Sequence, residues 1–112
     1  MLGMDIAFHS KALRDICESA ESLRKHFGAP AAESIMRRLA DLRAASSIND
    51  VAVGNPREAP KIRPQTMVLD AAAGYRILFR ANHLKPPLGP DGSINWSAVS
   101  RIKLMSIEKN DG

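Results

Sequence analysis

Cysteine and histidine, the residues that most often hold metals, are scarce in this sequence. Cys17 is the only cysteine, so no internal disulfide can form, and we expect a reducing compartment, the cytoplasm. His9, His26 and His83 lie far from one another and from Cys17 along the chain, so the spacing predicts no zinc site. We therefore expect neither a metal nor another cofactor.

Long apolar runs and familiar catalytic motifs are also missing. The longest uncharged stretch, at 92–100, has nine residues and is far shorter than the ~20 apolar residues of a membrane span, so we expect no membrane partner. No glycine-rich phosphate loop, nucleophile elbow or paired-carboxylate motif is found. The 112 residues suffice for one hydrophobic core. We expect one domain over 1–112, with 1–3 a vector remnant or upstream start and 108–112 a tail.

Acidic residues are scarce in the second half of the chain. Residues 57–112 hold nine Lys and Arg against five Asp and Glu, whereas residues 1–56 hold seven of each, so the net charge of +4 lies in the second half. Such an excess suits a polyanion or an acidic partner. The alternative, that these bases only solvate a sheet, stays open at this point.

Hydrophobic periodicity predicts two helices near the N-terminus. Apolar residues recur every three or four positions from 13 to 27, after Ser10 as N-cap and before Gly28 as a stop. A second stripe runs from 32 to 42, with Pro30 in the first turn of its helix. The short connection predicts an antiparallel helical hairpin, followed by a loop at 46–57.

Alternating patterns predict strands on both sides of these helices. They cover 4–9, 66–70, 75–80 and 99–107, and a long loop occupies 81–95. The resulting order β-α-α-β-β-β predicts an α+β fold in which the helical hairpin packs on one face of a mostly antiparallel twisted sheet.

Four segments resemble the RelE/ParE toxin superfamily, and most closely its HigB-like plasmid-maintenance killer proteins. They are RRLADLRAA at 37–45, GNP at 54–56, GYRILF at 74–79 and INWSAVSRIKLMSI at 94–107. The resemblance spans 4–107 and implies a RelE-like fold and the toxin of a type II toxin-antitoxin system.

That resemblance also implies partners and a reaction. The partner would be a cognate antitoxin, commonly a helix-turn-helix protein of the HigA type, in a heterotetramer. The freed toxin would enter the ribosome and cut mRNA as an endoribonuclease. The chemistry is metal-independent attack of a ribose 2′-OH on the adjacent phosphate, which needs charge stabilisation and proton transfer.

Arg76 is the first candidate for the site. It matches the arginine of the GYR segment, which contacts phosphate in the family. Alternation places Arg76 and Arg80 on one strand face, opposite Tyr75, where two guanidinium groups could hold a phosphate. The alternative for Arg76 is a surface ion pair with an acid such as Asp70.

Further basic residues are candidates for holding the RNA backbone. Lys61 and Arg63 precede the second strand, and Lys103 and Lys109 lie in or just after the last one. Where RelE-like toxins carry lysines before the GYR turn, this chain has apolar residues at 67–69. Trp96 can stack on a base, although packing at the core edge is the commoner fate.

The C-terminus departs from the family. Many killer proteins end the last strand with Asp-Tyr-His, whereas an ungapped alignment places Asn110 at the Tyr and Asp111 at the His. Asp111 and His83 are therefore the candidates for proton transfer. The departure leaves two alternatives open: a catalytically degenerate module that pairs with its antitoxin and co-represses their operon, and a ParE-like gyrase inhibitor.

Overall fold

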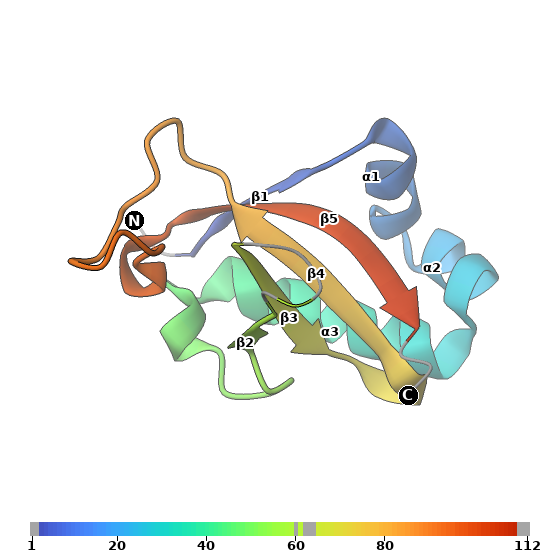
Figure 1. The fold of residues 1–112 in the computed structure, drawn as a ribbon. Coiled ribbons are helices and arrows are strands. Elements are labelled where there is room, and N and C mark those ends of the chain that lie inside the picture. Colours follow the sequence, from blue (N-terminus) through green and yellow to red (C-terminus); the bar gives the residue numbers. More distant parts are fainter. Residues whose placement is uncertain (1–2, 60, 62–64, 110–112) are drawn as a thin grey trace.

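The computed structural model describes residues 3–59, 61 and 65–109, which form an α+β fold of three α-helices and one five-stranded mixed sheet (Figure 1). The helices are α1 (Lys11–Cys17), α2 (Ala20–Phe27) and α3 (Ala29–Ala44). The strands are β1 (Asp5–Phe8), β2 (Arg57–Glu58), β3 (Thr66–Asp70), β4 (Tyr75–Ala81) and β5 (Arg101–Lys109).

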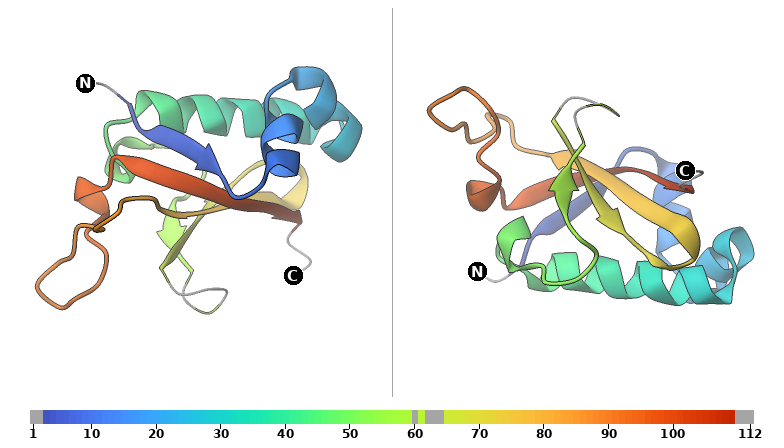
Figure 2. Two further views of the ribbon diagram at one scale, coloured as in Figure 1. Left: turned by 90° about the horizontal axis from the view of Figure 1, so that it is seen from above. Right: turned by 60° about the horizontal axis from the view of Figure 1, so that its bottom comes forward.

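The sheet has the strand order β1-β5-β4-β3-β2, with β1 and β2 at its edges. β1 pairs with β5 in parallel, and the remaining pairs are antiparallel. Helix α3 runs along one face of the sheet, and α1 and α2 stand together at one end of α3 (Figure 2). The predicted α+β class and the mostly antiparallel sheet are confirmed. No helix in the described ranges is long and apolar enough to cross a membrane.

The prediction of one continuous first helix is wrong, because the chain restarts its helix at Ser19. Ser19 is extended, and its side chain accepts a hydrogen bond from the backbone N–H of Ser22 at 3.0 Å, so it caps α2 as a new N-terminus. The other predicted signals are confirmed. Ser10 caps α1 through the N–H of Leu13, and Gly28 separates α2 from α3 at a positive φ of 83°.

Two strand boundaries also differ from the prediction. The expected loop at 46–57 ends in the two-residue strand β2, which pairs with β3 through Arg57 and Val68. The expected tail at 108–112 begins too early, since β5 continues through Glu108 and Lys109 to pair with β4. Glu108 and Lys109 are therefore residues of the sheet and not of a tail.

The core lies between the sheet and the helices. Ile77 and Phe79 of β4 are fully buried there, together with Leu104 of β5 and Ile35 of α3. Cys17 belongs to the same cluster, and burial raises the pKa of its thiol to about 11, against a weaker opposing effect of Arg43. Such a thiol is unreactive near neutral pH.

A β-bulge changes which residues of β5 face the helices. Leu104 pairs with Phe79, but the next pair joins Ser106 to Leu78, so Met105 is an extra residue on β5. Beyond the bulge, Ile107 packs against the core, and Glu108 turns to the opposite side of the sheet.

Candidate nucleic-acid interface

The sheet face opposite α3, here called the open face, carries most of the charged side chains of the sheet. The residues that alternate with the core positions stand on it in three neighbouring cross-strand rows. The rows are Asp70–Arg76–Glu108, then Arg57–Val68–Leu78–Ser106, and then Thr66–Arg80–Lys103–Ala7.

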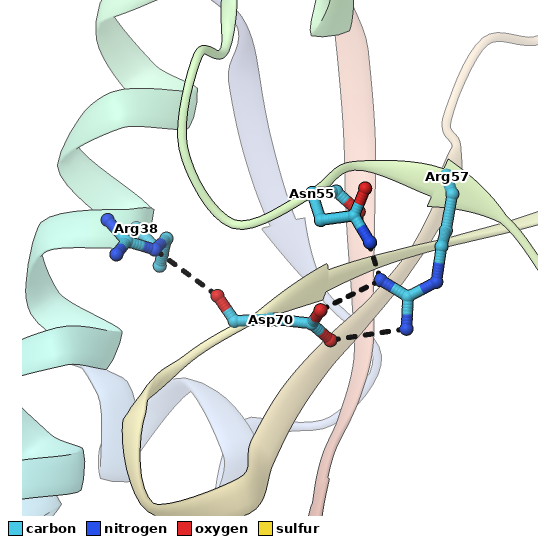
Figure 3. A network of polar contacts seen from close by, with 4 residues as sticks. All are labelled: Arg38, Asn55, Arg57 and Asp70. Carbon is cyan, nitrogen blue, oxygen red and sulfur yellow. Dashed lines mark hydrogen bonds and ion pairs between the residues drawn. The ribbon is translucent and has the colours of Figure 1, made fainter.

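Asp70 is held from two sides by arginines (Figure 3). Arg57 makes a bidentate ion pair with its carboxylate, at 2.9 and 3.2 Å. Arg38 of α3 donates through Nε to the backbone carbonyl of Asp70 at 3.2 Å. Arg57 also donates to the carbonyl of Asn55, which fixes its fork geometry. These contacts connect α3, β2 and the end of β3 through one polar network beside Arg76.

Arg76 lies between two acids in register but is paired with neither. Its cross-strand neighbours are Asp70 on β3 and Glu108 on β5. The Nε of Arg76 is buried and has no hydrogen-bond partner among the residues that the structure describes. The predicted alternative of an ion pair with Asp70 is therefore wrong, since Arg57 occupies that carboxylate. A buried guanidinium N–H without an acceptor is costly, which marks Arg76 as a position that folding alone does not explain.

Glu108 is the site residue that sequence reasoning missed. It lies directly opposite Arg76 on β5, and its carboxylate accepts a 2.7 Å hydrogen bond from the hydroxyl of Ser106. Simple alternation from Leu104 would have turned Glu108 toward the helices, and the bulge at Met105 reverses this. No feature of the sequence predicts that bulge.

At the other end of the open face, two basic residues stand opposite each other. Arg80 and Lys103 are cross-strand partners, an arrangement that destabilises a sheet when no counter-charge is present. Arg80 donates to the side-chain oxygen of Gln65 at 3.3 Å, and within the described ranges neither base makes an ion pair with an acid. The pair is therefore available to bind an anion.

The structure separates the remaining candidates from this face. Lys109 lies on the helix side, with its ammonium 5.7 Å from the centre of the Tyr75 ring. His83 lies past the opposite end of β4 from Arg76, and its Nε2 accepts hydrogen bonds from the backbone N–H groups of Ser100 and Arg101 at 3.1 and 3.2 Å. That nitrogen is occupied in tethering a loop.

The last predicted residues fall in three places. Lys61 is exposed in a turn, whereas Arg63 and Asp111 lie outside the described residues. Trp96 is buried and packs edge-on against Phe79, so its expected place in the core is confirmed. Its indole N–H donates to Glu58 of β2 at 3.3 Å.

Ligand groups for a metal do not gather in this part of the molecule. Among the residues described, no three His, Cys, Asp or Glu side chains form a group that could hold a metal ion. A comparison of the chain with models of protein families, with curated proteins and with solved structures found no match.

Proposed function

We propose that the chain is the toxin of a type II toxin-antitoxin system, of the HigB-like RelE/ParE type, and that it cuts ribosome-bound mRNA in the cytoplasm. The four sequence segments carry the family part of this proposal. A helix-turn-helix antitoxin would be its partner, in a heterotetramer. An α+β domain with a charged open sheet face is compatible with that fold.

The observation that carries the RNA-cleaving part is the state of Arg76. Its guanidinium stands on the open face with a buried, unpartnered Nε, between acids that are bound elsewhere. Arg76 as a whole is only part-buried, so a phosphate oxygen can supply the acceptor that this group lacks once the side chain turns outward. Arg80 and Lys103 lie about 13 Å further along the sheet, at ~3.3 Å per residue, and are placed to bind a neighbouring part of the RNA backbone.

The residues of the Arg76 row divide the chemistry between them. As the ribose 2′-oxygen attacks phosphorus, negative charge grows on the phosphate oxygens, and Arg76 stabilises it. Glu108 takes the 2′-OH proton, with Ser106 orienting its carboxylate. The bond from phosphorus to the 5′-oxygen breaks, and that oxygen takes a proton from water. Glu108 then returns its proton to the hydroxide, which leaves a cyclic phosphate and a 5′-hydroxyl.

The test is induced expression followed by mapping of RNA ends, with purified ribosomes programmed with mRNA as the second assay. Wild type should give cuts clustered at codons. Arg76→Ala should lower the cleavage rate by about 10²–10³-fold, as when one donor to a developing oxyanion is removed. Arg37→Ala is the matched control, because Arg37 is exposed on α3 and should leave cleavage unchanged.

Cleavage that survives Arg76→Ala in a folded protein would remove this residue from the site. Intact transcripts with the wild-type protein would instead favour a binding module that pairs with the antitoxin and co-represses the operon. One observation favours this second candidate: the Nε2 of His83, a potential proton-transfer group, is occupied by two backbone N–H donors. The module would bind a helix-turn-helix protein encoded beside it and would cut no RNA.

A further inference from the structure

The loop at 82–95, which joins β4 to β5, projects beyond the sheet (Figure 1), and hydrogen bonds brace it at its base and near its tip. Asn82 donates to the carbonyl of Arg101 at its base, where the ring of His83 also binds. Near the tip, the backbone joins Gly89 to Ser93 and Asn95 to Pro87. These hydrogen bonds hold the backbone of the loop in one arrangement.

Asp91 fastens the tip of the same loop. Its carboxylate accepts hydrogen bonds from the hydroxyl of Ser93 at 2.7 Å and from the backbone N–H of Ser93 at 3.1 Å. These bonds hold the pKa of Asp91 below its usual range. The acid is therefore engaged within the tip itself.

Apolar side chains of this loop face water. Leu84 is 100% exposed and Leu88 is 58% exposed, and Pro86 beside them is also exposed. One exposed leucine needs no explanation, but several apolar side chains on one ordered loop form a surface that burial would stabilise. Because the loop backbone is already held by hydrogen bonds, binding a partner costs less conformational entropy than it would for a free loop.

A cavity of about 330 Å³ opens at the base of the loop and joins these apolar groups to the basic end of the open face. Leu84, Pro86 and Ile94 line it together with Arg80. Lys103 stands opposite Arg80, and Lys85 follows Leu84 in the loop. Gln65 and His83 also line the hollow, so the surface combines a hollow of mixed polar and apolar lining with exposed apolar side chains and cationic groups.

We infer that loop 82–95 and the Arg80–Lys103 pair form a docking surface for an acidic protein segment that carries an apolar anchor. The anchor packs against Leu84 in the cavity, and flanking carboxylates neutralise the Arg80–Lys103 pair. RNA fits this surface less well, since leucine and proline offer neither hydrogen bonds nor an aromatic ring to a base.

This surface shares Arg80 and Lys103 with the proposed RNA contacts. A docked acidic segment would therefore exclude RNA from that end of the open face, and this consequence rests on the proposed function. The docking itself does not, because it can be measured without RNA or cleavage.

The experiment selects binders from a library of random short peptides on the immobilised full chain at about 0.15 M salt. We expect enriched peptides to combine Asp or Glu with Leu, Ile or Phe. Leu84→Ser should weaken a synthesised binder at least about tenfold, the loss expected when a buried leucine contact is removed. Lys103→Glu should weaken it as well. The matched control is Val53→Ser, which alters a 51% exposed side chain in another segment and should change nothing.

Three results would overturn the docking surface: no enrichment, enriched peptides without acidic residues, or equal affinity for Leu84→Ser. A Leu84→Ser variant that loses affinity for a single-stranded RNA oligonucleotide instead of the peptide would assign the loop to RNA. Competition between that oligonucleotide and the peptide tests the shared end separately. Peptide docking that survives in a protein without RNA cleavage would refute the proposed function and leave the docking surface standing.

Discussion

The two faces of the sheet differ in burial and in charge. The face toward α3 is apolar and closed, and side chains such as Phe79 and Ile102 have no exposed surface. On the open face, Asp70 is held by two arginines, whereas Arg76, Arg80 and Lys103 have no acidic partner within the described ranges. Packing accounts for the closed face. The open face also buries Val68 and Leu78, but its cationic groups lack acidic partners there, and this is why we assign them to a ligand.

The largest effect expected from this comparison is on the closed face. Phe79→Ala should lower the free energy of unfolding by about 3–5 kcal/mol, because a fully buried ring and its edge contact with Trp96 are lost. Arg80→Ala, the adjacent residue on the open face, should change it by less than ~0.5 kcal/mol. Urea titration measures both. A similar cost for the two variants would show that the open face is structural, and Phe79→Leu serves if the alanine variant does not fold.

Much of the closed face could be predicted from the sequence, because apolar periodicity is a local signal. The stripe through Ile35 and Leu39 and the alternation of Ile77 with Phe79 give the helix and strand that meet in the core. The same alternation placed Arg76 on the opposite face. These predictions use only the repeat of each element.

The composition of the open face could not be predicted, because it depends on non-local pairing. The bulge at Met105 brings Glu108 beside Arg76 and sends Lys109 to Tyr75. The short strand β2 supplies Arg57, which takes Asp70 away from Arg76. The restart of the helix at Ser19 was missed for another reason: the apolar stripe continues through it.

The assignment of β5 residues to the two faces can be tested directly. Ile107 packs against the core, whereas Met105 is the extra residue of the bulge. Ile107→Ala should destabilise by about 1–2 kcal/mol, less than full burial would give, and Met105→Ala should cost less than that. Regular alternation would put both on the same face and predicts similar costs. Equal values in urea titration would therefore argue against the bulge.

The turn that joins β3 to β4 stores strain. Ala73 has φ 60° and ψ 27°, a left-handed conformation that a Cβ atom disfavours. Ala73→Gly should raise the free energy of unfolding by about 0.5–1 kcal/mol, because the relieved strain exceeds the added freedom of the unfolded chain. Ala72→Gly is the matched control and should destabilise by about 0.5–1 kcal/mol, since Ala72 is right-handed. A loss of stability at both positions would contradict the left-handed assignment.

The smallest expected change in stability is the sharpest test of the open face. Lys103→Glu replaces a like-charge pair with an opposite-charge pair across from Arg80, so stability should rise by about 0.2–1 kcal/mol. If the Arg80–Lys103 pair binds phosphate as proposed, the same change removes that contact and adds repulsion, so affinity for single-stranded RNA and its salt dependence should both fall. Lys109→Glu, with the same change of charge on the helix side, should leave RNA affinity nearly unchanged. If the variant is more stable and binds RNA less well, the Arg80–Lys103 pair serves a ligand and lowers the stability of the sheet. Unchanged RNA binding would mean that the pair does not serve RNA.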